Sequence, residues 1–252
     1  MSEAPEPPFP VTARIAVIAP HPDDFDAIGV ALRLCRDAGM DLELAVLTGG
    51  ASGVEDGYRG VTTPGAKGDL REEEQRASCR FFGLADDRVT FLRLAEDAEG
   101  DLAPDPANRK RLRAYLLERR PNVVFMPHGN DSNADHRHCH AMVDGIAREE
   151  RLAVLACLNR DPKTIAMRAD LYAGFGDEVA AWKAELLRFH QSQHRRNLNT
   201  RGHGFDERIL RVNRQIAAEL GGAWPYAESF QVERLGMPGN RGALGVQADD
   251  GA

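Results

Sequence analysis

The 252-residue chain has little cysteine, and this scarcity excludes several architectures. Its four cysteines are scattered along the sequence with no paired spacing: Cys35, Cys79, Cys139 and Cys157. Such a pattern does not indicate a disulfide framework or a cysteine zinc site, and it is typical of reduced thiols in the cytoplasm. We therefore expect a cytoplasmic protein whose stability comes from a packed core.

Long apolar runs and an excess of positive charge are also absent. No stretch approaches the roughly 20 apolar residues of a transmembrane helix, and the N-terminus lacks a basic and apolar signal segment. The formal net charge of −7 argues against a nucleic-acid or anionic-membrane partner, because both require a basic field. We expect no transmembrane segment and no nucleic-acid partner, while the sequence remains compatible with a homo-oligomer.

The chain does contain alternating strand and helix patterns. Strands are predicted at residues 14–19, 42–48, 89–94, 122–127 and 152–158, with a weaker one at 164–168. Helices are predicted at 26–38, 69–82, 106–119, 136–150, 178–193 and 207–220. The alternation predicts an α/β fold, a Rossmann-like three-layer sandwich with a mostly parallel sheet. We expect a disordered leader at 1–12, one domain at 13–235 and a flexible tail at 236–252.

The most informative motif follows the first predicted strand and reads Pro20-His21-Pro22-Asp23-Asp24. An aspartate here could simply cap the next helix. Two successive carboxylates cannot both be caps, however, and histidine with aspartate is a common ligand set for zinc. Open α/β proteins bind their ligands at the carboxyl ends of their strands, where this motif lies. A hydrolytic metal site is therefore the leading hypothesis.

A second polar cluster, residues 128–140, begins at the end of the predicted strand 122–127 and runs into the next helix. It contains four histidines: His128, His136, His138 and His140. An exposed histidine run at a helix start is the simpler alternative. The cluster nevertheless occupies the same position relative to its strand as the first motif. Both motifs are therefore expected at one edge of the sheet.

Two further segments are less informative. The glycines after the second strand, Gly49, Gly50 and Gly53, could cradle a phosphate, but a nicotinamide cofactor is disfavoured because its fingerprint belongs after the first strand. They more simply form a turn that lets a substrate approach the backbone. The basic stretch 188–203 is best explained as a solvated helix face and loop, although some of its arginines could bind an anionic part of a substrate.

With both motifs considered together, the chain resembles the PIG-L/LmbE family of zinc-dependent N-deacetylases. The first motif matches the family's (A/P)HPDD, and residues 131–136 match its D-x-H-P-D-H pattern. Weaker similarities are found in Thr48-Gly49-Gly50, Arg71-Glu72-Glu73-Glu74, Phe82-Gly83-Leu84, His190-Gln191-Ser192-Gln193 and Tyr226-Ala227-Glu228-Ser229-Phe230. The resemblance covers residues 14–230.

This resemblance implies a role for each matching residue. His21, Asp24 and His136 would bind one Zn²⁺ per chain, which is the three-ligand set with an open position that catalytic zinc requires. Asp23 would be the general base that deprotonates the metal-bound water. Arg71 would contact the substrate.

The sequence departs from the family at one position, because Asn133 replaces the first histidine of the second motif and Ala134 replaces its proline. An asparagine amide can donate a hydrogen bond to an oxyanion but cannot transfer a proton. Either Asn133 stabilises the charge while Asp23 does the proton work, or another histidine supplies the acid. The candidate histidines are His128, His138, His194 and His203.

The predicted function is zinc-dependent removal of an N-acyl group, most simply N-acetyl, from a small amino sugar or sugar conjugate. Metal-bound water would attack the amide carbonyl with Asp23 as general base and Asn133 as a catalytic donor. One alternative is an amidase that acts on a larger conjugate through the same site. The other is a catalytically weak homologue that binds metal or sugar, in which Asn133 marks lost activity.

Overall fold

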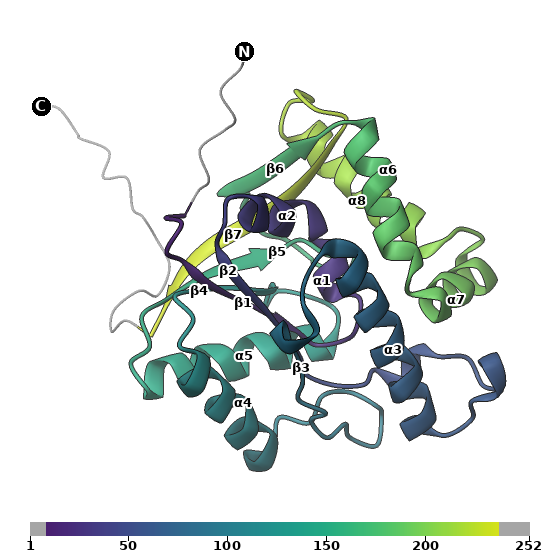
Figure 1. The fold of residues 1–252 in the computed structure, drawn as a ribbon, viewed down its shortest axis with the longest axis horizontal. Helices are drawn as coiled ribbons and strands as arrows, with labels where there is room; N and C mark the ends of the chain where they lie inside the picture. The colour runs from purple at the N-terminus through teal and green to yellow at the C-terminus, as the bar shows by residue number, and fades with distance from the viewer. Residues whose placement is uncertain (1–8, 237–252) are drawn as a thin grey trace, which may run out of the picture.

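A computed structural model describes residues 9–236. It contains one seven-stranded sheet with the order β3-β2-β1-β4-β5-β7-β6 (Figure 1). Neighbouring strands from β3 to β5 are parallel, whereas β7 runs antiparallel to both β5 and β6. The predicted α/β fold with a mostly parallel sheet is therefore confirmed. The strands are β1 (Arg14–Ala19), β2 (Asp41–Val46), β3 (Val89–Phe91), β4 (Val123–Pro127), β5 (Val154–Asn159), β6 (Leu171–Phe175) and β7 (Tyr226–Leu235).

The central strands are apolar on both faces because helices cover both. Along β1, Ile15 and Val17 belong to one hydrophobic core, whereas Ala16 and Ile18 belong to the other. The first core is completed by residues of α2 (Gly29–Asp37), α3 (Pro64–Phe82) and α6 (Asp177–Arg188), and the second by residues of α4 (Pro106–Arg119) and α5 (Ala134–Glu149). Helix, sheet and helix thus form three layers, as expected for a parallel sheet.

Two of the predicted helices have different boundaries in the structure. The predicted helix 26–38 is two helices, α1 (Asp24–Ala27) and α2, which meet at Ile28. The Glu228 carboxylate on β7 accepts the backbone N–H groups of Val30 and Ala31, at 3.0 and 2.7 Å, and so begins a new helix there. The predicted helix 178–193 is likewise divided into α6 and α7 (Gln191–Arg201), and the last helix is α8 (Phe205–Glu219).

The sheet also has one difference from the sequence prediction. Residues 164–168 form no strand, and Thr164 makes only an isolated bridge to Asp131. The strand that follows β5 in the chain is β6, and the long strand β7 inserts between β5 and β6. Apolar and polar residues are mixed along β7, and β6 has only five residues, so both strands are defined by their antiparallel pairing and not by a local pattern.

A buried ion pair fastens the helical layer to the sheet below the β1 motif. Lys183 of α6 is fully buried, and its ammonium donates to Glu228 at 2.6 Å, to the Asn213 side chain at 2.8 Å and to the Ala27 carbonyl at 2.7 Å. Three donors and three acceptors are thereby matched, as a buried ammonium requires. Lys183 thus connects Ala27, the last residue of α1, to Glu228 on β7. This contact fixes the position of the short helix that begins with Asp24.

The expected leader and tail fall largely on residues 1–8 and 237–252, which lie outside the described residues. Within the described part of the expected leader, Phe9 is buried and its ring lies edge-on to Phe125 at 6.1 Å. Across residues 9–236, every helix is too short or too polar to cross a membrane.

Candidate active site and metal centre

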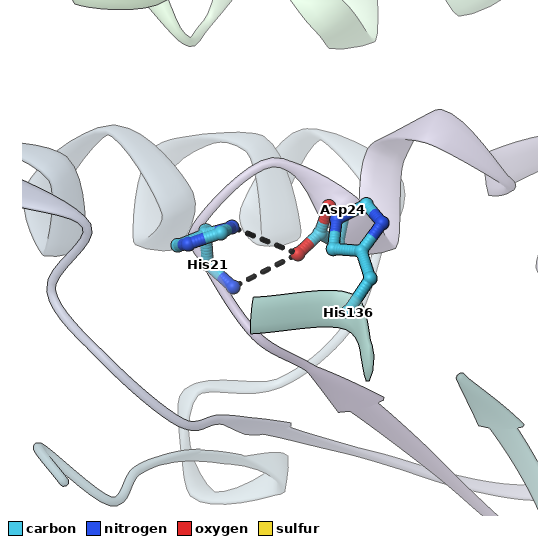
Figure 2. Close-up of side chains that lie close together, drawn as sticks. All are labelled: His21, Asp24 and His136. Atoms are coloured by element: carbon cyan, nitrogen blue, oxygen red, sulfur yellow. Dashed lines mark hydrogen bonds and ion pairs between the residues drawn. The ribbon is translucent and has the colours of Figure 1, made fainter. Parts of the chain in front are cut away.

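The two polar motifs meet at the carboxyl edge of the sheet. β1 pairs in parallel with β2 on one side and with β4 on the other, so the loops after β1 and β4 leave the same edge. His21 follows β1, Asp24 begins α1, and His136 lies in the first turn of α5. One ligand atom from each of these three residues lies within 4.8 Å of the others (Figure 2). The structure thus brings together the three residues that the sequence motifs single out for a metal.

The distances between these side chains suit a divalent ion. His21 Nδ1 is 3.6 Å from one oxygen of Asp24, and His136 Nε2 is 3.7 Å from the other. Both distances are long for hydrogen bonds. Two ligands at about 2.0–2.2 Å from a tetrahedral zinc lie roughly 3.3–3.5 Å apart. The donor set, two imidazoles and one carboxylate, therefore fits a catalytic zinc.

Two further aspartates orient the imidazoles. His21 Nε2 is 2.7 Å from Asp135 Oδ2, and His136 Nδ1 is 3.2 Å from Asp131 Oδ2. Each carboxylate engages the ring nitrogen that faces away from Asp24, which leaves the other nitrogen directed at the ligand position. Carboxylates commonly hold metal-binding histidines in this way, fixing the ring and raising its basicity.

The electrostatics of the site favour a bound cation. Burial lowers the pKa of His21, but Asp135 and Asp24 outweigh burial and raise this pKa to about 9. Burial raises the pKa of Asp24, but His136 and His21 outweigh burial and bring this pKa well below its ordinary value. The carboxylates therefore attract positive charge, either as protons on the imidazoles or as a metal ion that displaces those protons.

Asp23 is held differently from the adjacent Asp24. Its backbone is left-handed (φ 116°), and its N–H donates to Gln75 Oε1 of α3 at 2.9 Å. Its carboxylate pairs with Arg71 Nη2, also at 2.9 Å. Burial raises the pKa of Asp23 above its ordinary value, against the opposing charge of Arg71. A carboxylate with a raised pKa beside a ligand set is suited to accepting and returning a proton.

Arg71 lies at the site, but other parts of the chain already engage its guanidinium. Nη1 donates to the Gly50 carbonyl at 2.8 Å, and Nη2 donates to the Pro22 carbonyl as well as contacting Asp23. The side chain is only 4% exposed. Its geometry connects α3, the glycine turn and the first motif, and it holds the Asp23 carboxylate in place.

Asn133 is the N-cap of α5. Its Oδ1 accepts the Asp135 N–H at 3.2 Å, and its own N–H donates to Asp131 Oδ1 at 2.7 Å. The residue also lines the cavity that contains the metal ligands. Within residues 9–236 its Nδ2 group makes no hydrogen bond, so this amide remains available to a ligand.

The cavity at the site has a volume of about 390 Å³, within the range of small-molecule sites. The four histidines considered as alternative acids do not line it. His128 accepts the Asn130 N–H, His138 contacts the Leu102 carbonyl, His194 faces Asp206 and His203 contacts the Gly204 carbonyl. The histidines that line the cavity are His21 and His136, both in the ligand set.

Several residues of the site have no assigned role in the sequence analysis. Asp131 and Asp135 both lie shortly before His136 in the sequence, so this proximity is a usable signal. Asp161 and Arg208 also line the cavity, but they come from segments with no motif. Burial raises the pKa of Asp161, whose ligand atom lies within 4.8 Å of those of Asp131 and His136. Only the folded chain brings these two residues to the site.

The fold is α/β, and its carboxyl edge carries two histidines and one aspartate that could hold a metal ion. Residues 16–147 match the family described as PIG-L: GlcNAc-PI de-N-acetylase. Because this match covers more than half of the chain, the protein belongs to that family. The family resemblance inferred from the two motifs is thus confirmed.

Individual relatives are more distant. A diacetylchitobiose deacetylase of Thermococcus kodakarensis is 28% identical over 136 residues, which are 52% of this chain and 48% of the relative. The match therefore spans about half the length of that relative. The solved N,N'-diacetylchitobiose deacetylase of Pyrococcus horikoshii, bound to its inhibitor MPG, is 18% identical, with a TM-score of 0.71 over 88% of this chain and 84% of that one.

The same fold also occurs in an enzyme with a different reaction. The 4-carboxy-2-hydroxymuconate hydratase GalB of Pseudomonas putida KT2440 is 19% identical, with a TM-score of 0.62 over 92% of this chain and 99% of that one. At such identities the likeness shows the fold alone. The reaction must therefore be argued from the residues of the site.

The first prediction concerns metal binding. The purified protein should hold about one zinc per chain, and His136→Ala should abolish binding because it removes one of three ligands. His140→Ala is the matched control, since His140 lies on the same helix outside the cavity. Metal content is measured by elemental analysis after dialysis. Undiminished zinc in His136→Ala would refute the ligand assignment.

The second prediction concerns pH in the metal-free protein. The pKa of His21 rises from 6.5 to about 9, so its stabilisation is complete below pH 6.5 and is lost as pH rises through 9. The free energy of unfolding, measured with urea in a chelator, should thus fall between pH 6.5 and 9. Zinc should remove this dependence, because bound imidazoles carry no titrating proton. A metal-free protein equally stable at pH 6 and 9.5 contradicts the prediction.

Proposed function

We propose that this protein is a zinc-dependent N-deacetylase that removes an acetyl group from a small amino sugar or sugar conjugate. The observation that carries the proposal is the joint presence, in one cavity, of the His21, Asp24 and His136 set and the separately held carboxylate of Asp23. Family membership and the deacetylase activity of the named relatives support it.

The chemistry divides between the bound ion and the chain. A zinc ion in the His–Asp–His set would lower the pKa of a water molecule and polarise the amide carbonyl. Asp23 accepts a proton during attack and returns it to the leaving amine. Its raised pKa makes the protonated state accessible, and Arg71 prevents the carboxylate from turning toward the metal ligands.

The Nδ2 group of Asn133 supplies a neutral hydrogen bond where the family pattern has histidine. Its carbonyl oxygen is fixed by the helix cap, so its Nδ2 group has a defined direction. An oriented amide stabilises developing negative charge without titrating. Asp23 then carries out proton transfer, because the histidines other than His21 and His136 do not line the cavity.

The proposal predicts different consequences for the two adjacent aspartates. Asp23→Asn should retain zinc and lose about 10²- to 10⁴-fold in kcat, as expected for loss of a general base. Asparagine tolerates the left-handed backbone at this position, so the variant should fold normally. Asp24→Asn should lose zinc. Acetate release from N,N'-diacetylchitobiose and elemental analysis measure both effects.

Some outcomes would contradict the separate roles of Asp23 and Asp24, and others would contradict the proposed function. Equal loss of zinc from both variants would make Asp23 a ligand. A zinc-loaded wild-type protein that binds acetylated sugars but releases no acetate would favour the binding-protein alternative, and turnover restricted to large conjugates would favour the amidase.

Because Asn133 also caps α5, its variants must separate loss of the cap from loss of the amide donor. Asn133→Ser preserves a cap oxygen but removes the amide donor, so kcat should fall by about 10²- to 10³-fold while the melting temperature stays close to wild type. Asn133→Ala should lose the same activity and also about 1 kcal/mol of stability. Asn133→His should add a limb to the pH–rate profile near pH 6–7. Full activity in Asn133→Ser would remove Asn133 from the mechanism.

A further inference from the structure

The cavity that contains the metal ligands is also lined by four basic side chains from outside the family motifs. Lys163 lies in the segment after β5, Arg196 and Arg201 lie on α7, and Arg208 lies on α8. The two helices lie next to α6 at one side of the sheet (Figure 1). Residues from three separate segments therefore bring positive charge to one cavity.

These four cations differ from neighbouring basic residues in having no acidic partner. Among residues 9–236, none of the four side chains forms an ion pair or a side-chain hydrogen bond. Nearby arginines do, because Arg188 pairs with Asp206 at 2.7 Å, Arg195 approaches Glu55 at 3.8 Å and Arg211 pairs with Glu207. Of the five basic residues that line the cavity, only Arg71 pairs with a carboxylate within ion-pair distance among the described residues.

The charge count shows that the metal-loaded cavity has a positive surplus. Its lining contains five acidic residues, Asp23, Asp24, Asp101, Asp135 and Asp161, and five basic ones, Arg71, Lys163, Arg196, Arg201 and Arg208. A divalent ion in the His–Asp–His set adds two positive charges to this balanced lining. This surplus occurs in a chain whose formal net charge is −7. A cavity of that kind attracts anions.

Arg208 is the most constrained of the four. It is half-buried in the first half of α8, where burial and the neighbouring charges of Arg201 and Arg196 lower its pKa, against the attraction of Asp161 and Asp23. The mutual repulsion of Arg208, Arg201 and Arg196 is unfavourable, and a bound anion relieves it.

We propose that the substrate carries a carboxylate or phosphate group, separate from the acetylated amine, which binds to Arg208 with Arg201, Arg196 and Lys163. This inference rests on the proposed deacetylase function and names its substrate class, an acidic N-acetylated sugar. The planar guanidinium forms paired hydrogen bonds with both anions, and two or more arginines from adjoining helices can surround one such group.

The test compares neutral and acidic substrates of the zinc-loaded enzyme. N-Acetylglucosamine and N,N'-diacetylchitobiose are neutral, N-acetylmuramic acid adds a carboxylate, and N-acetylglucosamine 6-phosphate adds a phosphate. At least one acidic substrate should have kcat/KM about 10-fold or more above the neutral monosaccharide. The acidic compound that is preferred identifies the anion.

Matched variants locate the effect. Arg208→Gln should lower kcat/KM for the preferred acidic substrate by about 10- to 100-fold, mainly through KM, and should lower kcat/KM for neutral substrates by a clearly smaller factor. Arg211→Gln on α8 and Arg195→Gln on α7 make the same charge change outside the cavity and should leave both classes unchanged. Equal use of neutral and acidic substrates by wild type, or equal losses for both in Arg208→Gln, would overturn the inference.

A binding measurement separates this inference from the proposed function. If no substrate releases acetate, the deacetylase proposal fails, and calorimetry with glucosamine 6-phosphate and glucosamine still tests the anion site. Tighter binding of the phosphate compound that Arg208→Gln abolishes and Arg211→Gln preserves would support the site. Equal binding of both compounds by wild type would refute it.

Discussion

The position of β1 between β2 and β4 is the constraint on which the site depends. Both neighbours run parallel to β1, so the chain leaves β1 toward one side of the sheet and later returns on the other. The loops after β1 and β4 consequently face each other at one edge. Residues 114 positions apart, His21 and Asp135, are hydrogen-bonded because of this topology. The proximity of the three candidate metal ligands therefore depends on strand order as much as on the motifs.

A second constraint gives adjacent carboxylates different environments. At Asp23 the backbone is left-handed, so its side chain and that of Asp24 leave the chain in different directions. The α3 residues Arg71 and Gln75 hold the Asp23 side chain and backbone, respectively. Gln75 in turn donates to the buried Asp26, whose same oxygen lies 2.6 Å from His190. This buried polar network extends the site into the helical layer and fixes the strained turn.

The sequence predicts the features that depend on local residue patterns, namely the central strands and the two polar motifs. Apolar runs predict the central strands, and the resemblance of the two motifs to the family implies His21, Asp24 and His136 as metal ligands, which the structure brings together. Local patterns could not show the break at Ile28, because its cause is a carboxylate on β7, some 200 residues away along the chain. They also missed β7, whose strand character depends on pairing with β5 and β6.

The residues that sequence reasoning missed share one physical property, which is that their role depends on charge brought together by folding. Asp161 and Arg208 belong to no motif, yet each changes the charge of the same cavity.

With the family's histidine replaced by Asn133, the lining combines fixed charges with carboxylates whose pKa values burial raises. In the proposed mechanism proton transfer falls to a carboxylate, while the arginines without an acidic partner give the cavity a charge that is constant across neutral pH. Under these two proposals, the site keeps its attraction for an acidic substrate in either protonation state of Asp23. The proposals thereby assign substrate capture and proton transfer to different residues, so separate substitutions at Arg208 and Asp23 can distinguish the two roles.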